Sequence, residues 1–237
     1  MKLPIVCSQC MVEDVATARP IATIAFRDDG RYATVCPKGH TSVTILQQQK
    51  FEVLFEIGAY AIVDGYYREA VSSFTSSLER FFEFFIRASL LEKGIVETVI
   101  GESWQRVASQ SERQFGAFIF MYASDFGTPP PTLSNSRVSF RNEVIHKGKI
   151  PSFEEAVDYG QAVLDILRPV LREAKEKYPE GVSKTIFQHL RQCRASEDDG
   201  RAVSTICIPT IISLSAGESS HDKKSLEEAL QGLRRWG

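Results

Sequence analysis

The chain has 237 residues, of which 43% are hydrophobic and 24% are charged, and this ordinary globular composition excludes a largely disordered or collagen-like chain. With 28 Lys and Arg against 30 Asp and Glu, the formal net charge is −2. No overall positive field therefore attracts nucleic acid or anionic lipid, and any such contact requires a local patch.

Two features of the sequence bear on the compartment. No apolar run approaches the roughly 18 residues that a membrane span requires. The first seven residues, MKLPIVC, lack the long apolar stretch of a signal peptide. We therefore expect a cytoplasmic protein of one or two domains, in which cysteine pairs hold metal more often than they form disulfides.

Three cysteines and one histidine form two short knuckles near the start of the chain. The first knuckle is a CxxC pair, and the second has the sequence CPKGH. A CxxC turn directs two thiolates at one ion, and the glycine of the second knuckle permits the turn that brings its histidine round. Three thiolates and one imidazole form a closed tetrahedral site, which suits structural zinc and leaves no open position for catalysis. The expected zinc ligands are Cys7, Cys10, Cys36 and His40.

Two strands are expected between the knuckles, over residues 21–26 and 31–35, joined by the turn Arg27-Asp28-Asp29-Gly30. Residues 1–46 thus resemble a zinc ribbon. A module this small cannot bury enough apolar surface to fold alone, so the metal supplies the deficit. Two roles stay open for the ribbon: structural scaffolding or docking, and direct contact with nucleic acid. The basic residues that favour the second role are Lys2, Arg19, Arg27, Arg31 and Lys38.

A helical region follows the ribbon. Its first helix covers about residues 51–62 and ends at Asp64-Gly65, and its second helix begins near Tyr67. The second helix carries four phenylalanines within five residues, which makes its C-terminal half apolar nearly all round. Such a helix is buried on more than one side, and we expect part of this stripe to contact a second subunit. Further helices are predicted over about residues 96–110 and 112–125.

Capping residues mark two more helices. A short helix follows Ser134–Ser136, and Gly148 suits the left-handed turn past its end. Ser152 and Glu155 form a capping box at the start of a long helix. Pro169 lies inside this long helix and should kink it.

The C-terminal extension, residues 179–237, gives mixed signals. It predicts a helix over 182–194, a linker over 195–200, a strand over 203–214 bent at Pro209, a loop over 215–220 and a helix over 224–236. The expected fold class is therefore mainly α. A helical bundle over residues 51–178 is preceded by the small β ribbon and followed by a mixed α/β extension.

The segment Arg141-Asn142-Glu143-Val144-Ile145-His146 carries most of the functional signal. On a helix, Asn142 and His146 share one face, whereas Arg141 reaches that face only through its long side chain. A guanidinium can grip the oxygens of a phosphodiester in a fork, and an imidazole can move protons near neutral pH. The basic residues around this segment, against the single acid Glu143, are Arg137, Arg141, Lys147 and Lys149.

This segment resembles the Arg–polar–three residues–His motif of the HEPN family. The resemblance extends to the preceding helix pair, with the turn Gly65-Tyr66-Tyr67 and then Glu69-Ala70-Val71 leading into Ser77-Leu78-Glu79-Arg80. It spans about residues 51–178 and implies an all-helical bundle. It also implies metal-independent cleavage of RNA in a composite site, formed where two motif helices of a homodimer face each other. Relatives of this kind serve as toxins or anti-phage defence effectors, so an antitoxin or a defence-system partner is implied as well.

The resemblance also assigns roles to the residues of the motif. His146 would move a proton at the 2′-hydroxyl or at the leaving oxygen, and Arg141 would stabilise the pentavalent phosphorane. Asn142 would orient the imidazole or the phosphate. Glu79 occupies a place where some relatives have a supporting polar residue. The expected products are a 2′,3′-cyclic phosphate and a 5′-hydroxyl, since the attacking oxygen belongs to the ribose.

Other readings of the same residues stay open. The protein could be a non-catalytic nucleic-acid-binding or regulatory HEPN module within a larger complex. In that case His146 would only cap the C-terminal end of its helix, where positive charge is favourable. His189 and Cys193 lie four residues apart on a predicted helix and could form a base and a nucleophile, although no third group to orient them is evident. No glycine-rich phosphate loop occurs, so nucleotide hydrolysis has no support.

Overall fold

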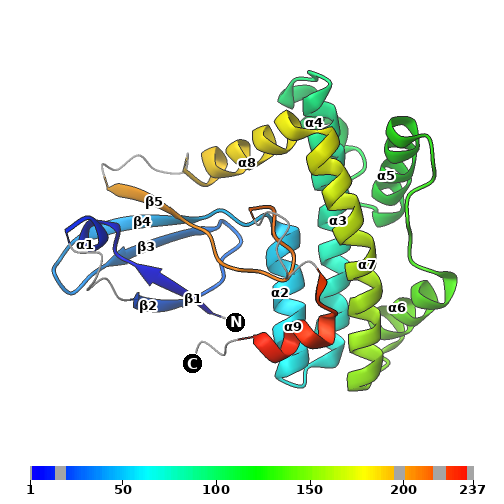
Figure 1. The fold of residues 1–237 in the computed structure, drawn as a ribbon, viewed down its shortest axis with the longest axis horizontal. Helices are drawn as coiled ribbons and strands as arrows, with labels where there is room; N and C mark the ends of the chain where they lie inside the picture. The colour runs from blue at the N-terminus through cyan, green and yellow to red at the C-terminus, as the bar shows by residue number, and fades with distance from the viewer. Residues whose placement is uncertain (1, 14–19, 195–200, 216–222, 234–237) are drawn as a thin grey trace. The chain divides into compact units, whose positions relative to one another are not determined.

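The computed structural model describes residues 2–13, 20–194, 201–215 and 223–233 (Figure 1). The chain forms two compact units. Unit 1 contains residues 1–48 and 186–209, and unit 2 contains residues 49–185 and 210–233. The extension predicted over 179–237 therefore contributes residues to both units. The predicted linker 195–200, the predicted loop from 216 onward and Arg19 lie outside the described residues.

Unit 1 carries the described strands of the chain in two small sheets. Strands β1 and β2 pair in antiparallel fashion, and the second sheet has the order β3-β4-β5. Helix α1 follows β1. The bounds of these elements are β1 Lys2–Val6, α1 Ser8–Glu13, β2 Pro20–Ala25, β3 Arg31–Val35, β4 Thr41–Leu46 and β5 Ala202–Ile206.

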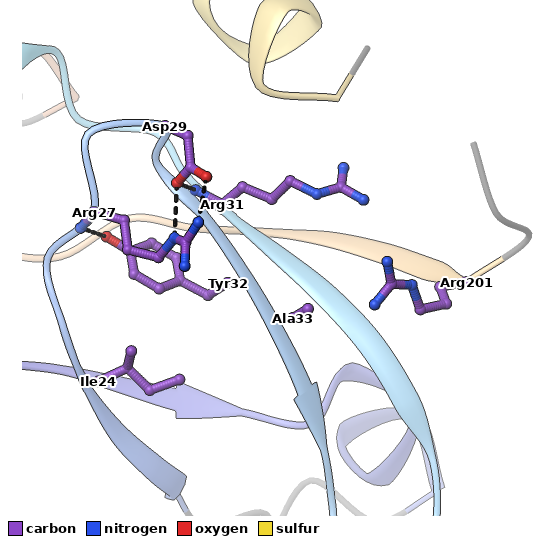
Figure 2. A pocket seen from close by; sticks show the side chains of 7 residues that line it. All are labelled: Ile24, Arg27, Asp29, Arg31, Tyr32, Ala33 and Arg201. Carbon is purple, nitrogen blue, oxygen red and sulfur yellow. Dashed lines mark hydrogen bonds and ion pairs between the residues drawn. The ribbon is translucent and has the colours of Figure 1, made fainter. Parts of the chain in front are cut away.

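The strands predicted over residues 21–26 and 31–35 and the turn between them are confirmed, but the two strands do not pair with each other. Gly30 donates to the Arg27 carbonyl at 3.1 Å and has a φ of +61°, so the turn is present (Figure 2). It connects strands of different sheets, because β2 pairs with β1 and β3 pairs with β4. The alternating buried residues Leu3 and Ile5 give the start of the chain a strand pattern that competes for β2.

Strand β5 adds a parallel neighbour to β4, with Val203 paired to Val43 and Ile206 to Leu46. The strand predicted over 203–214 is correct in this first part and wrong from Cys207 onward, where the backbone becomes irregular. The Gln48 side chain explains the change, because its amide donates to the Ile208 carbonyl at 2.8 Å and accepts from the Ile208 N–H at 3.2 Å. These bonds replace the ladder bonds that a longer strand would make.

Unit 2 is helical, and the described part of the chain confirms every helix predicted within it. The short helix that follows Ser134 and the long helix that follows Ser152 begin with the predicted caps, and Gly148 has a φ of +75°. The long helix continues through Pro169. None of the described helices has the length and apolarity that a membrane span requires. The bounds are α2 Lys50–Val63, α3 Tyr67–Glu92, α4 Glu97–Gln105, α5 Ser111–Phe126, α6 Asn135–Lys147, α7 Phe153–Lys177, α8 Pro179–Arg194 and α9 Leu226–Gly232; α8 begins in unit 2 and ends in unit 1.

Helix α3 forms the centre of unit 2, and its phenylalanines are covered inside the unit. The ring of Phe51 lies 5.3 Å from that of Phe81, and the ring of Phe118 lies 4.4 Å from that of Phe82 and 5.2 Å from that of Phe85. The prediction that this stripe contacts a second subunit is therefore wrong for these side chains. The four residues, all at most 5% exposed, are Phe81, Phe82, Phe84 and Phe85.

Two buried glutamates on α2 bind the segment 210–214, which we call the strap. Glu52 accepts hydrogen bonds from the Leu214 N–H at 2.8 Å and from the Gln49 N–H at 2.7 Å. Glu56 accepts from the Ile211 N–H at 3.0 Å. Both side chains are at most 3% exposed, so backbone N–H groups satisfy carboxylates that water does not reach.

Candidate functional site

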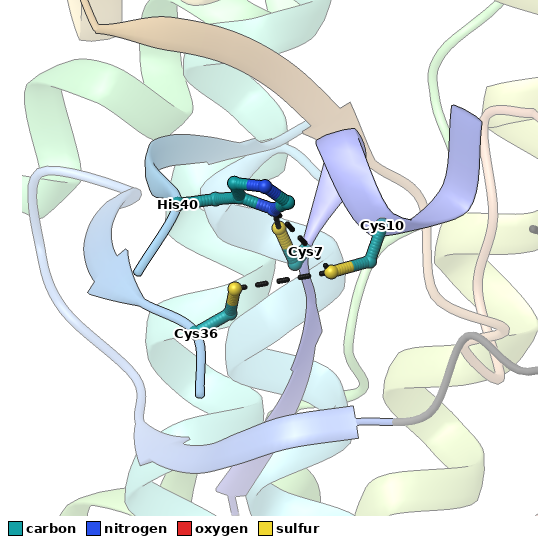
Figure 3. Close-up of side chains that lie close together, drawn as sticks. All are labelled: Cys7, Cys10, Cys36 and His40. Atoms are coloured by element: carbon teal, nitrogen blue, oxygen red, sulfur yellow. Dashed lines mark hydrogen bonds between the residues drawn. The ribbon is translucent and has the colours of Figure 1, made fainter. Parts of the chain in front are cut away.

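The four predicted zinc ligands come together in unit 1 (Figure 3). Cys7 follows β1, Cys10 lies on α1, and Cys36 and His40 flank the turn between β3 and β4. Two backbone bonds close that turn, from the Cys36 N–H to the His40 carbonyl at 3.0 Å and from the Gly39 N–H to the Cys36 carbonyl at 2.8 Å. Gly39 has a φ of +82°, so the glycine serves the purpose expected of it.

The spacing of the ligand atoms suits one tetrahedral ion. His40 Nδ1 lies 3.5 Å from the Cys10 Sγ and 3.8 Å from the Cys7 Sγ, and the sulfurs of Cys10 and Cys36 lie 3.8 Å apart. Ligand atoms at ordinary zinc–sulfur and zinc–nitrogen distances in a tetrahedron are roughly 3.4–3.8 Å apart. The three cysteines form no disulfide. These residues could therefore hold a metal ion.

A carboxylate orients the histidine of this cluster. His40 presents Nδ1 to the sulfurs, and its Nε2 lies 3.4 Å from a carboxylate oxygen of Glu13. The other oxygen of Glu13 lies 2.9 Å from the Lys38 ammonium. Metal-bound histidines are commonly held in this way by a carboxylate on the second ring nitrogen. Glu13 was not predicted from the sequence, because it lies three residues after Cys10 and no spacing rule marks such a partner.

The thiols of the cluster are crowded. Desolvation, together with the neighbouring thiols of Cys7 and Cys36, raises the pKa of Cys10 to about 11. Several thiolates side by side repel one another, and a divalent cation reverses that balance because it favours the deprotonated ligand. The cluster therefore has the electrostatic character of a cation site.

Helix α6 in unit 2 carries the predicted catalytic motif. The Ser134 Oγ accepts from the Arg137 N–H at 3.4 Å at the start of the helix, and the Lys149 N–H donates to the Glu143 carbonyl at 3.1 Å across its end. The fully buried Val144 anchors the helix to the core. His146 lies in the last turn and is exposed.

Arg141 is less exposed than His146. It is half-buried, and its Nε is enclosed without a hydrogen bond to any described residue. Its positive charge acts on Glu79 of α3 and on Tyr159 of α7. Burial raises the pKa of Glu79, and Arg141 opposes that rise. The guanidinium therefore lies in the field of a half-buried carboxyl group that the resemblance had marked only as a supporting position.

The local positive patch is weaker than its sequence suggests. Arg137 forms an ion pair with Asp158 of α7. Lys149 lies 2.7 Å from a carboxylate oxygen of Glu155 and 3.7 Å from one of Glu143. The expectation of four cations against one acid is therefore wrong, because α7 and α3 bring three further carboxyl groups to this helix. Lys147 stays exposed beside His146.

The motif residues do not form a closed triad within one chain. Among the described residues, no hydrogen bond joins Arg141, Asn142 and His146 to one another. Asn142 is half-buried. A site that uses all three side chains would thus require the substrate or a second copy of the helix to connect them.

The alternative pair on α8 also forms. The Cys193 Sγ lies 3.8 Å from the Nδ1 and 3.9 Å from the Nε2 of His189. The Nε2 lies 2.9 Å from the Leu46 carbonyl, which is the orienting group that the sequence did not reveal. Because the sulfur is almost equidistant from the two ring nitrogens, it is not aligned with either lone pair as a nucleophile requires.

Comparison with known proteins identified no relative of this chain. The chain matches no protein-family model, no curated protein and no solved structure.

Proposed function

We propose that the protein is a metal-independent endoribonuclease of the HEPN type, which acts as a cytoplasmic homodimer. The observation that carries the proposal is the position of His146, exposed in the last turn of α6, five residues beyond a half-buried arginine. The helix order of unit 2 supports it, with the pair α2 and α3, then α4 and α5, the motif helix α6 and the long closing helix α7. A role as toxin or anti-phage effector follows from the resemblance.

In this proposal His146 takes the proton of a ribose 2′-hydroxyl or returns a proton to the leaving 5′-oxygen. The 2′-oxygen forms a bond to phosphorus as the bond from phosphorus to the 5′-oxygen breaks, which gives a 2′,3′-cyclic phosphate and a 5′-hydroxyl. Arg141 stabilises the charge of the phosphorane, and its guanidinium lies in the field of the Glu79 carboxyl group. Asn142 orients the imidazole or the phosphate. The second copy of α6 completes the site.

The test is cleavage of single-stranded RNA by the wild-type chain and by variants of α6. His146→Ala should abolish cleavage. Lys184→Ala, which removes an exposed cation from helix α8 and not from the motif helix, should leave the rate within about twofold. An RNA with a 2′-deoxyribose at the cleaved position should stay intact. Cleavage that survives His146→Ala, or cleavage of the deoxy substrate, would contradict the proposal.

The assay needs a particular control for metal. A strong chelator would strip the Cys3His cluster and could mimic a requirement for catalytic metal. The protein is therefore freed of magnesium by gel filtration without chelator, and its zinc content is measured before the assay. The proposed chemistry continues without magnesium at constant zinc content.

A second candidate function is a non-catalytic binding or regulatory module. The ion pairs of Arg137 and Lys149 favour it, because they reduce the positive charge that a nuclease site could offer to RNA. Such a module would retain RNA or a partner protein in a mobility-shift assay and would form no products at any enzyme concentration.

We also propose that the Cys3His cluster holds zinc in a structural role. The donor set is soft and tetrahedral, which selects zinc among the common divalent ions. Four protein ligands leave no open position for a substrate. Metal analysis of the purified chain should give one zinc per chain, and Cys36→Ser should remove it.

A further inference from the structure

The part of helix α8 that belongs to unit 1 carries an exposed aromatic ring and two exposed arginines. Phe187 is 65% exposed, and Arg191 and Arg194 are exposed as well. From Ile186 to Arg194 the helix has the sequence IFQHLRQCR, which contains no acidic residue. This stretch of helix therefore combines apolar surface and positive charge.

The helical period places the three side chains on one face. Arg191 lies four residues after Phe187, and Arg194 lies three residues after Arg191. At 3.6 residues per turn, these positions fall within an arc of about 60°, and at 1.5 Å per residue they span about 10 Å along the helix. We call these three residues the α8 stripe.

Contacts on the opposite face of the helix fix the direction of the stripe. His189 Nε2 lies 2.9 Å from the Leu46 carbonyl at the end of β4. An added Cβ at Gly30 would lie 3.5 Å from the Cys193 Sγ. His189 and Cys193 lie more than a third of a turn away from every residue of the stripe. The helix is thus anchored to unit 1 by one face, and the stripe occupies the other.

The two arginines of the stripe have no acid partner within the part of the chain that the structure describes. Arg194 contributes only its carbonyl oxygen to the described hydrogen bonds, as the acceptor of a bond from Arg31. Lys184, one turn before Phe187, differs from them because it lies 3.1 Å from a carboxylate oxygen of Glu180. The stripe is therefore positive, and Lys184 does not belong to it.

Three acids that follow the helix in sequence limit how far this charge reaches. Glu197, Asp198 and Asp199 come three to five residues after Arg194. They reduce the net charge of this part of unit 1, and salt screens fields beyond about 10 Å. A polyanion must therefore be held by direct contact with the two guanidiniums.

The combination of ring and guanidiniums selects the class of ligand. Guanidiniums bind phosphate oxygens in a fork, and an exposed aromatic ring stacks on an unpaired base. Bases within a duplex are covered by their neighbours, so only a single strand offers both groups. An acidic peptide would engage the arginines, but a nucleic acid carries a planar base beside every phosphate.

We propose that the α8 stripe binds single-stranded RNA, with an unpaired base stacked on Phe187 and neighbouring phosphates on Arg191 and Arg194. The choice of RNA over single-stranded DNA rests on the proposed function. The choice of a single-stranded nucleic acid rests on the stripe itself. Unit 1 would thus hold the substrate through a surface that neither the metal cluster nor the α6 motif uses.

The experiment measures binding of a fluorescently labelled 12-nucleotide RNA to the full, zinc-loaded chain by anisotropy. All proteins carry His146→Ala, so cleavage does not interfere. Arg191→Ala with Arg194→Ala should raise the Kd at least about tenfold at 0.1 M salt. It should also reduce the slope of log affinity against log salt by about 1.4, which corresponds to two lost phosphate contacts on a single strand. Circular dichroism checks that each variant is folded.

The chain offers a matched control for the arginines. Arg106 and Arg172 are exposed arginines of unit 2, and among the described residues neither has an acid partner. Arg106→Ala with Arg172→Ala removes the same charge as the stripe variant and should leave the Kd within about twofold. Equal effects of the two double variants would overturn the proposal, because binding would then follow net charge alone.

The ring has a control of its own. Phe187→Ala should raise the Kd about fivefold or more through the lost stacking, whereas Phe187→Trp should keep the Kd within about twofold. Phe120→Ala removes a ring that is 79% exposed on α5 and should have little effect. The residues three and four positions from Phe120, none of them charged, are Gly116, Ala117, Ala123 and Ser124. Unchanged binding by Phe187→Ala would overturn the assignment to a stacked base.

Competition identifies the ligand. Unlabelled single-stranded RNA should compete better than duplex RNA or polyglutamate at the same concentration of charge, and Phe187→Ala should lose most of this preference. Equal competition by polyglutamate would assign the stripe to an acidic protein and overturn the proposal.

Cleavage is measured separately, on chains that retain His146. A chain that cleaves no RNA, but whose stripe variants lose binding, would refute the proposed nuclease and support the stripe. A chain that cleaves RNA, but whose stripe variants bind as the control variants do, would refute the stripe alone.

Discussion

At Gly181, the packing of unit 2 leaves no space for a side chain. An added Cβ at this position of α8 would overlap the carbonyl oxygen of Ala88 and would lie 2.9 Å from its carbonyl carbon, in the backbone of α3. Because backbone cannot rotate away as a side chain can, Gly181→Ala should lower the free energy of unfolding by about 1–3 kcal/mol or more. Urea unfolding followed by circular dichroism measures the change.

Gly101 provides the matched control for this substitution. It lies inside helix α4, and no atom lies within 4 Å of an added Cβ. Gly101→Ala should therefore stabilise the protein by about 0.5–1 kcal/mol through the lower backbone entropy of alanine. If the two variants changed stability equally, the close packing of α8 on α3 would be contradicted.

Glu13 tests how much the orientation of His40 contributes to metal binding. Glu13→Ala removes the carboxylate that lies 3.4 Å from His40 Nε2, and losses of such partners typically cost about 10–100-fold in metal affinity. Titration with a competing zinc chelator measures the affinity. Asp28→Ala makes the same change of charge in unit 1 away from the cluster and should leave the affinity nearly unchanged. An unaltered zinc affinity in Glu13→Ala would show that the histidine needs no such support.

The roles of individual residues differ in how well the sequence predicts them. The zinc ligands of the ribbon were predictable, because their chemistry demands a short spacing within each knuckle. Glu13 was not, since its position beside His40 depends on where the fold places the first helix next to the second knuckle. The ion pair of Arg137 with Asp158 was missed for a similar reason, because the acid lies on another helix. Local spacing encodes ligands within one turn, whereas partners from other elements depend on the fold.

Among the elements, the strap on α2 predicts a dependence of stability on pH. Burial raises the pKa of Glu52 and of Glu56 to about 7, and the hydrogen bonds from the strap only partly oppose it. Between pH 4.5 and 7 the folded chain keeps protons that the unfolded chain has released. The free energy of unfolding should therefore fall as the pH rises through this window, by up to about 3 kcal/mol for each carboxyl group.

The measurement compares urea unfolding at pH 5 and pH 8. Glu52→Gln with Glu56→Gln keeps oxygen acceptors for the strap and should remove most of this loss, so that the variant changes less between the two pH values than the wild type does. Glu102→Gln, an exposed position on α4, should retain the slope of the wild type. A double variant with the same slope as the wild type would show that these carboxyl groups titrate normally.

The helices were far easier to predict than the strands. The periodicity of α3 and the caps Ser134 and Ser152 are properties of contiguous sequence. Features of this local kind predicted the helices of unit 2. The pairing of β2 with β1 and of β4 with β5 is not local. The alternation of apolar and polar residues therefore predicts a strand but not the strand with which it pairs. The error at 207–214 has the same origin, because Gln48 competes for those backbone groups from a distant part of the chain.

For the whole molecule, the division into two units predicts what removal of metal does. All four ligands lie in unit 1, whereas the core of unit 2 rests on aromatic packing around α3. A small sheet unit has little apolar surface to bury, so its folding should depend on the ion. Chelation should therefore abolish the order of unit 1 and leave most of the helical circular dichroism signal intact.

Thermal unfolding of the zinc-loaded and the zinc-free chain tests this expectation. The zinc-free chain should retain one cooperative helical transition, while amide hydrogen exchange should become fast in β1 to β5 and stay slow in α3 and α7. Cys36→Ser should reproduce this pattern without a chelator, and Cys207→Ser, at an exposed cysteine outside the cluster, should not. Loss of protection in α3 together with the strands would mean that the two units unfold as one, and that the metal stabilises the entire chain.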